Sequence, residues 1–74
     1  MTIYENYLLD LGVLIKEMAL DAKKTATDCQ TDFAIGYMAG FHRVVSLMQQ
    51  QAEAFGIPLE KLELNGIDPD TDLV

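Results

Sequence analysis

The chain has 74 residues, of which 12 are acidic and 5 basic, so its formal net charge is −7. This length allows one domain, residues 1–74, with a small core that usually needs a disulfide, a metal or a partner subunit. A single cysteine excludes an intramolecular disulfide, and one cysteine with one histidine makes no zinc site. Because 50% of the residues are hydrophobic, association with a second copy is the expected remaining source of stability.

The acidic balance also limits the partners. Non-specific binding to DNA, RNA or anionic membranes depends on Lys and Arg, so none of these is expected. The first residues lack the basic region that opens a secretory leader and meet Glu5 at once. The longest weakly charged run, residues 33–48, contains His42 and Arg43 and is too short to cross a bilayer. Together with the unpaired Cys29, these features predict a cytoplasmic protein.

A first helix is predicted over about residues 3–26. It opens with a capping box, because Thr2 can accept from the amide of Glu5 while the Glu5 side chain reaches back. Apolar residues then recur at steps of three or four, the spacing of a helix that packs along one face. The expected packed stripe consists of Tyr4, Leu8, Leu11, Ile15, Met18, Ala22 and Ala26. The residues that widen this stripe on one side are Ile3, Tyr7 and Leu14.

Residues 27–32 predict a break between two helices. The segment has no Gly or Pro, but its Thr and Asp side chains compete with the helical backbone and favour caps and turns. Thr31 or Asp32 would be a good N-cap for the next helix. A connection this short makes the two helices antiparallel neighbours, and one uninterrupted helix is the alternative.

A second helix is predicted over about residues 32–55, with Gly56 as its C-terminal cap, and it is apolar around most of its circumference. Between Asp32 and Glu53 the only full charge is Arg43. One apolar stripe consists of Tyr37, Phe41, Val44, Met48 and Phe55, and another of Ala34, Met38, Val45 and Ala52. Because the first helix can cover only one stripe, an all-α helical hairpin that forms a dimeric four-helix bundle is expected.

Two glycines one turn apart, Gly36 and Gly40, form a bare strip on this second helix. A glycine inside a helix costs about 1 kcal/mol relative to alanine, so such a strip usually serves close packing. The packing partner is expected to be either the first helix or a second copy, and close approach of a ligand is the alternative. The interface candidates are Gly36, Tyr37, Ala39, Gly40, Phe41, Val44 and Met48.

The remainder of the chain changes character. Pro58 fits the start of a short helix, expected over about residues 58–64. In the acidic tail, residues 65–74, the dipeptide Asp68-Pro69 fits an N-cap and first helical position that open one more turn. Apolar residues spaced through this segment indicate that it docks, on its own subunit or on a neighbour: Ile57, Leu59, Leu62, Leu64, Ile67 and Leu73.

Three features suggest chemistry, and each has a simpler structural interpretation. Asp68, Asp70 and Asp72 have the spacing of the first ligands in a calcium loop, but the glycine and the final acid of that loop are missing. His42 has no serine or acid placed near it in sequence to form a relay. Cys29 has acidic neighbours, which disfavour a thiolate. We therefore expect no catalytic residue, no metal and no cofactor.

Three classes of function remain open. The leading hypothesis is a small non-enzymatic protein-interaction or regulatory module that acts as a homodimer. The second is an acidic inhibitor that mimics nucleic acid, of the type found among phage and plasmid accessory proteins. The third is small-ligand binding between the helices, although no paired inward carboxylates or Glu-x-x-His motif favours it.

Overall fold

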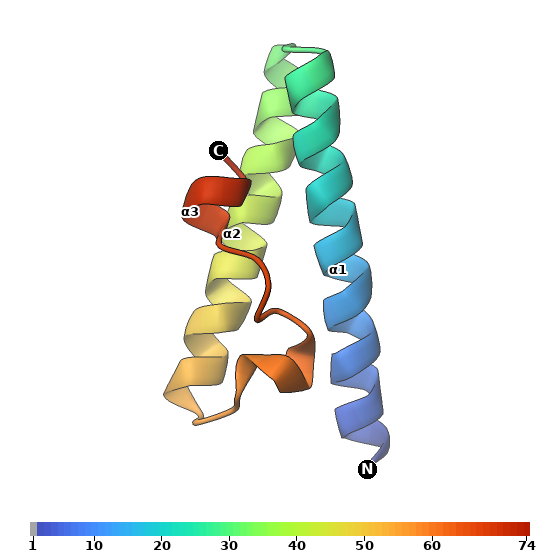
Figure 1. The fold of residues 1–74 in the computed structure, drawn as a ribbon, viewed down its shortest axis with the longest axis vertical. Coiled ribbons are helices and arrows are strands. Elements are labelled where there is room, and N and C mark those ends of the chain that lie inside the picture. Colours follow the sequence, from blue (N-terminus) through green and yellow to red (C-terminus); the bar gives the residue numbers. More distant parts are fainter. Residues whose placement is uncertain (1) are drawn as a thin grey trace.

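The computed structural model describes residues 2–74 and contains two long helices followed by two short ones. The elements are α1 (Ile3–Asp28), α2 (Asp32–Ala54), the 3-10 helix η1 (Leu59–Leu62) and α3 (Pro69–Asp72). Figure 1 shows α1 and α2 side by side and antiparallel, joined by a short turn. The predicted helical hairpin is confirmed, since residues 2–74 contain no strand and the chain breaks at residues 29–31 instead of continuing as one helix.

Helix α1 begins where the sequence predicts and ends two residues later. The Thr2 hydroxyl accepts from the Glu5 amide at 3.1 Å, and the Glu5 carboxylate accepts from the Thr2 amide at 3.3 Å, which completes the capping box. At the other end, the Thr27 hydroxyl donates to the Lys23 carbonyl at 2.9 Å. This threonine is therefore satisfied inside the helix instead of ending it, and α1 continues to Asp28.

Helix α2 is bounded by local signals at both ends. The Thr31 side chain accepts from the amide three residues further on at 3.1 Å. After the last turn, Gly56 adopts a φ of 68°, which glycine tolerates without steric cost. Its amide donates to the Glu53 carbonyl at 3.1 Å, and the Ile57 amide donates to the Ala52 carbonyl at 2.8 Å. These two bonds form a Schellman motif, so the predicted glycine cap is confirmed.

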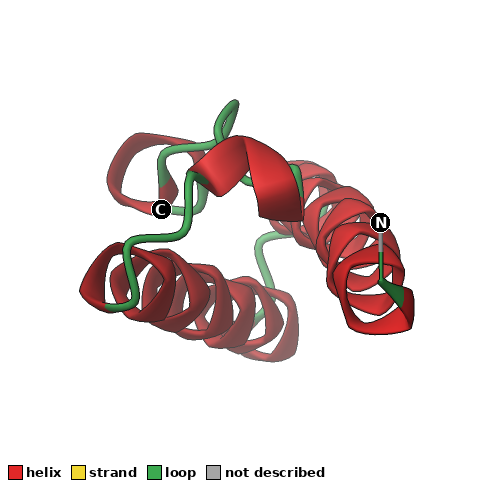
Figure 2. Cartoon of the chain, turned by 90° about the horizontal axis from the view of Figure 1, so that it is seen from below, coloured by secondary structure: helices red, strands yellow, loops and turns green. Residues whose placement is uncertain are grey.

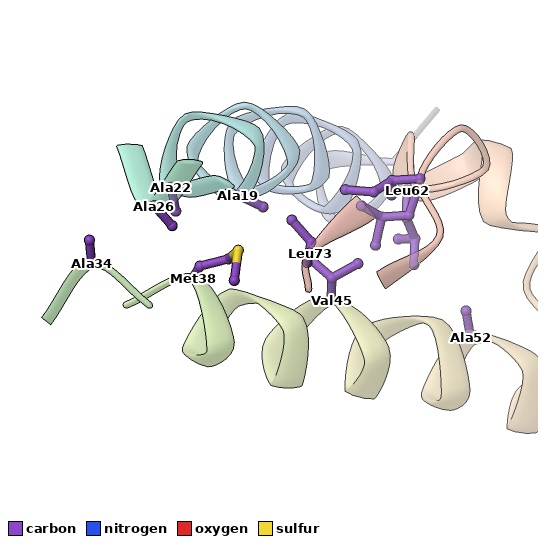
Figure 3. Close-up of a cluster of buried hydrophobic side chains, with 11 residues drawn as sticks. Ala19, Ala22, Ala26, Ala34, Met38, Val45, Ala52, Leu62 and Leu73 are labelled. Atoms are coloured by element: carbon purple, nitrogen blue, oxygen red, sulfur yellow. The ribbon is translucent and has the colours of Figure 1, made fainter. Parts of the chain in front are cut away.

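Near the turn, the two long helices contact each other through small side chains. Ala19, Ala22 and Ala26 of α1 lie opposite Ala34 and Met38 of α2, and all are buried (Figure 3). Alanines let helix backbones approach closely but bury little apolar area each. The larger core side chains come mainly from the C-terminal segment, residues 57–74, which contributes Leu62, Leu64, Ile67 and Leu73.

Away from the turn, the long helices spread apart and η1 packs against α1 between them (Figure 1). The closest approach falls on Gly12, where a Cβ atom would lie 1.7 Å from the Leu62 carbonyl oxygen. No side chain larger than hydrogen fits there without moving the backbone of η1. Gly12 is therefore the residue that lets the C-terminal segment enter the hairpin.

The stripe of α1 that packs within the chain differs from the predicted one. It consists of Gly12, Ile15, Ala19, Ala22 and Ala26, with Ile15 partly buried. The prediction was right for Ile15, Ala22 and Ala26 but wrong for Tyr4, Leu8 and Met18, which are exposed. The reason is that α2 and η1 lie close to α1, so small residues fill the contact and large ones turn away from it.

The C-terminal segment docks on the hairpin of its own chain. The predicted helix over 58–64 is instead the shorter η1, because Glu63 takes a left-handed φ of 54° and ends it. This turn directs Leu64 into the core, where it is fully buried. The Gln49 side-chain amide of α2 then donates to the carbonyls of Leu64 and Ile67 at 3.1 and 2.8 Å. Gln49 thus satisfies two backbone acceptors of the docked segment.

The last turn forms as the sequence predicts. The Asp68 carboxylate accepts from the Asp70 amide at 3.1 Å, with proline at the first helical position of α3. Two long-helix side chains then hold this end: His42 Nε2 lies 3.0 Å from the Asp70 carboxylate, and the Lys23 ammonium donates to the Val74 carbonyl. The segment is therefore attached to both α1 and α2.

Candidate interaction surface

The C-terminal segment covers one side of the hairpin and leaves the other side open. Figure 2 shows η1 and α3 on the same side of the two long helices. The side chains that anchor the segment, Lys23 on α1 and His42 and Gln49 on α2, mark that side. At 100° per residue, the positions that lie about 90–180° around each helix from these anchors make up the opposite side.

That opposite side is apolar on both helices, and we call it the open face. It consists of Tyr4, Tyr7, Leu11, Leu14 and Met18 of α1, of Phe33, Tyr37, Gly40, Phe41, Val44 and Met48 of α2, and of Phe55 at the C-cap of α2. Its largest residues are strongly exposed, with Tyr4 at 78%, Phe33 at 81% and Phe55 at 75%. None of its residues carries a charge. An exposed apolar patch that is continuous over two helices marks an interaction site.

A row of aromatic rings runs along the open face of α2. The Phe33 and Tyr37 rings are stacked, with centroids 6.0 Å apart. The Tyr37 and Phe41 rings meet edge to face, with centroids 5.2 Å apart. Each pair is separated by four residues, so the rings are neighbours along one side of the helix. These ring contacts hold the three side chains of the aromatic row against one another.

Two hollows adjoin the aromatic row. One, of about 290 Å³, lies between the helices beside the turn and is lined by Met18, Asp21, Phe33 and Tyr37 among others. The other, of about 340 Å³, lies over Gly40 and is bordered by Tyr37 and Val44. Helices pack against one another by fitting the side-chain ridges of one helix into the hollows of the other.

The glycine strip is not used for packing within the chain. A Cβ atom placed on Gly36 or Gly40 would meet nothing within 4 Å. Of the two packing partners expected for the strip, the first helix is therefore excluded, and packing against a second copy stays a prediction.

The structure brings together most of the interface candidates taken from the sequence. The hollow over the strip is lined by Gly36, Tyr37, Gly40, Phe41 and Val44. Met48 is half-buried on the same side of α2. Ala39 follows Tyr37 by two residues, which turns it about 200° around the helix, away from the open face.

Sequence reasoning missed the contribution of α1 to this surface. Every interface candidate lies on α2, yet Tyr4, Tyr7 and Met18 of α1 are exposed beside it. The signal was present in α1 as two neighbouring stripes, one of small residues that include Gly12 and Ala19 and one of large residues. Burial of the large residues is the simpler expectation, but the close approach of η1 leaves room only for the small ones.

Potentially reactive side chains within residues 2–74 serve local structure. No polar or charged side chain in this range is buried, and no group of Cys, His, Asp and Glu could hold a metal ion. Asp68 caps α3, Asp72 accepts from the Asp68 amide at 2.9 Å, and Asp70 pairs with His42. Cys29 is exposed at the turn. None of the helices described is long and apolar enough to traverse a bilayer.

Comparison of the chain with protein families, with curated proteins and with solved structures finds no match. The functional argument therefore rests on the surface itself.

Proposed function

We propose that the protein is a small, non-enzymatic protein-interaction module that acts as a homodimer. In this proposal, the open faces of two copies pack together and the two hairpins form a four-helix bundle. The observation that carries the proposal is a continuous, charge-free apolar surface on both long helices, opposite the C-terminal segment. Removing one large apolar side chain from water contributes about 1.5–3 kcal/mol, so burial of this surface favours association strongly.

The solvent-exposed area of the chain supports a partner of comparable size. The chain exposes 5167 Å², whereas a compact monomer of 8.2 kDa is expected to expose about 4,500 Å². The excess of about 600 Å² approaches the ~800 Å² that each partner buries in an interface of standard size. One further copy on the open face would therefore bring the exposed area of each chain close to the expected value.

The distribution of charge favours a second copy as that partner. Two chains that each carry a net charge of −7 repel each other wherever their acidic surfaces meet. The open face contains no acid, and Asp21 only borders it beside the turn, so two copies can approach there at little electrostatic cost. A cytoplasmic setting, which the single cysteine indicates, is part of the same proposal.

A matched pair of substitutions in α1 tests the proposal. Met18 and Leu20 have similar exposure, 49% and 45%, but only Met18 lies on the open face. Met18→Glu places a charge in the proposed seam and should convert the dimer to a monomer, because the carboxylate would be desolvated without a partner. Leu20→Glu introduces the same charge elsewhere and should leave the dimer intact. Molar mass by sedimentation equilibrium distinguishes these outcomes.

A wild-type chain that remains monomeric at high micromolar concentration would overturn the proposal. Equal loss of the dimer in both variants would show that the open face is not the seam.

A further inference from the structure

The two outer edges of the hairpin carry different charges. On α1, Asp10 and Glu17 lie about half a turn from the buried alanine stripe, so they point away from α2, and Asp21 lies between this edge and the hollow beside the turn, which it lines. On α2, Arg43 occupies the equivalent outer position. Within residues 2–74, the only ion pair joins His42 to the C-terminal segment. Arg43 and the acids of α1 therefore have no ion-pair partner inside that part of the chain.

Arg43 and Glu17 lie at the same height along the hairpin. Glu17 is 11 residues before the end of α1 at Asp28, and Arg43 is 11 residues after the start of α2 at Asp32. At 1.5 Å per residue, each is about 16 Å from the turn. They cannot meet within one chain, because they point outward from opposite edges.

The open faces of two copies can stack symmetrically in two ways, and these bring different pairs of edges together. If the two turns lie at the same end, α1 stacks on the partner's α2 and the edges of opposite charge coincide. If the turns lie at opposite ends, α1 stacks on the partner's α1, and edges of like charge coincide. Both arrangements bury the same apolar faces, so the charges at the rim decide between them.

The arrangement with the turns at the same end brings opposite charges together at two places along each edge. Arg43 lies level with the partner's Glu17, and Lys24 lies about one turn from the level of the partner's Asp32. In the opposite arrangement, Asp10 lies level with the partner's Asp21, and the two Arg43 side chains lie within about one turn of each other. That arrangement places like charges side by side along both edges.

We propose that two copies pair through their open faces with both turns at the same end, held in this orientation by Arg43 of each copy and the partner's Glu17. This inference rests on the proposed function, because it presupposes that the dimer forms. It further specifies which helix meets which: α1 of one copy packs against the partner's α2. The two C-terminal segments then lie on the outer surfaces of the four-helix bundle.

The native cysteine allows a direct distance measurement. Cys29 is exposed at the turn and is the only cysteine, so it takes one nitroxide label per chain without any substitution. With helix spacings of about 8–10 Å, labels on turns at the same end should be less than about 30 Å apart. With the turns at opposite ends, the separation should approach or exceed the 41 Å length of the molecule. Pulsed electron double resonance measures this separation.

The outcomes separate the two proposals. A dimeric mass with a short distance supports the orientation. A dimeric mass with a distance of about 40 Å or more overturns the orientation and leaves the homodimer in place. A monomeric mass without dipolar coupling overturns both proposals.

Substitution of Arg43 tests the orientation, because the two arrangements predict opposite changes in the dissociation constant of the dimer. If Arg43 faces the partner's Glu17, Arg43→Gln removes two attractive pairs and should weaken dimerisation about threefold to fivefold. If the two Arg43 side chains face each other, the same change relieves repulsion and should tighten the dimer. Lys61→Gln removes the same charge from η1, away from the open face, and should leave the dissociation constant within about twofold.

A charge swap provides a second test. Glu17→Arg and Arg43→Glu should each weaken the dimer, and the double variant should regain most of the affinity. A double variant no tighter than either single variant would contradict the pairing.

Discussion

The residue allowed at position 12 is determined by a contact with Leu62, which lies far along the chain. Its missing side chain leaves room for the Leu62 backbone, with the carbonyl oxygen and carbon at 1.7 and 2.7 Å from a virtual Cβ. Both atoms belong to the backbone, so they cannot rotate away as a flexible side chain would. The steric demand on this glycine is therefore strict, unlike that on Gly36.

The Gly12→Ala variant should lose about 1–3 kcal/mol of unfolding free energy, because η1 must shift to admit the methyl group. The Gly36→Ala variant is the control, since nothing in the chain lies within 4 Å of that position, and both changes are compared in the Met18→Glu background so that the proposed dimer seam does not contribute. In a helix interior, that change should be neutral or should stabilise the chain by up to about 1 kcal/mol. Urea denaturation followed by circular dichroism measures both. Equal stability of the two variants would contradict the close approach of η1.

Gln49 shows a limit of sequence reasoning at the same scale. In the sequence it belongs to a run of three glutamines, whose simplest interpretation is a polar face near the end of a helix. In the structure it alone of the three donates to the carbonyls of Leu64 and Ile67. Nothing local distinguishes Gln49 from Gln50, because the acceptors come from the returning chain. Gly12 was not singled out for the same reason.

At the scale of elements, the ends of the helices were predictable because their signals are local. The Thr2–Glu5 capping box, the Thr31 cap and the left-handed Gly56 each involve residues a few positions apart. The buried stripe of α2, which includes Met38 and Val45, was also identified. The buried stripe of α1 was only partly right, because two neighbouring stripes fit helical spacing and long-range packing selects between them.

The C-terminal segment behaves as a structural element of the core, although it has little regular structure. Leu64 is fully buried and is among the largest buried side chains, whereas Ile57 in the same segment is 37% exposed. Leu64→Ala should therefore cost about 2–5 kcal/mol through lost burial and a residual cavity. Ile57→Ala should cost about 1 kcal/mol or less. Thermal unfolding of the two variants gives the comparison, and similar melting temperatures would argue against docking of the segment.

At the scale of the whole molecule, the chain is elongated, with extents of 41 × 21 × 16 Å. This shape leaves a large surface relative to its volume, so the isolated chain has little margin of stability. If the open face joins two copies, folding and association are coupled, and the melting temperature depends on concentration.

The melting temperature should accordingly rise by about 5–10 °C over a hundredfold increase in protein concentration. The Met18→Glu variant should melt at the same temperature throughout that range, because a monomer unfolds in a first-order equilibrium. Differential scanning calorimetry at a fixed scan rate provides the measurement. A wild-type melting temperature that does not change with dilution would rule out the coupling.

The chain should fold only late in its synthesis, because its larger core side chains lie near the C-terminal end of the sequence. The two long helices contribute mostly alanines to the core, and four of its six larger residues come from residues 62–73. During synthesis, a hairpin that has emerged without these residues has little apolar area to bury, so it should interconvert freely with unstructured forms. Folding should become cooperative only when Leu73 is available. Amides of α1 around Gly12 and of the C-terminal segment should then exchange with solvent at the same free energy of opening.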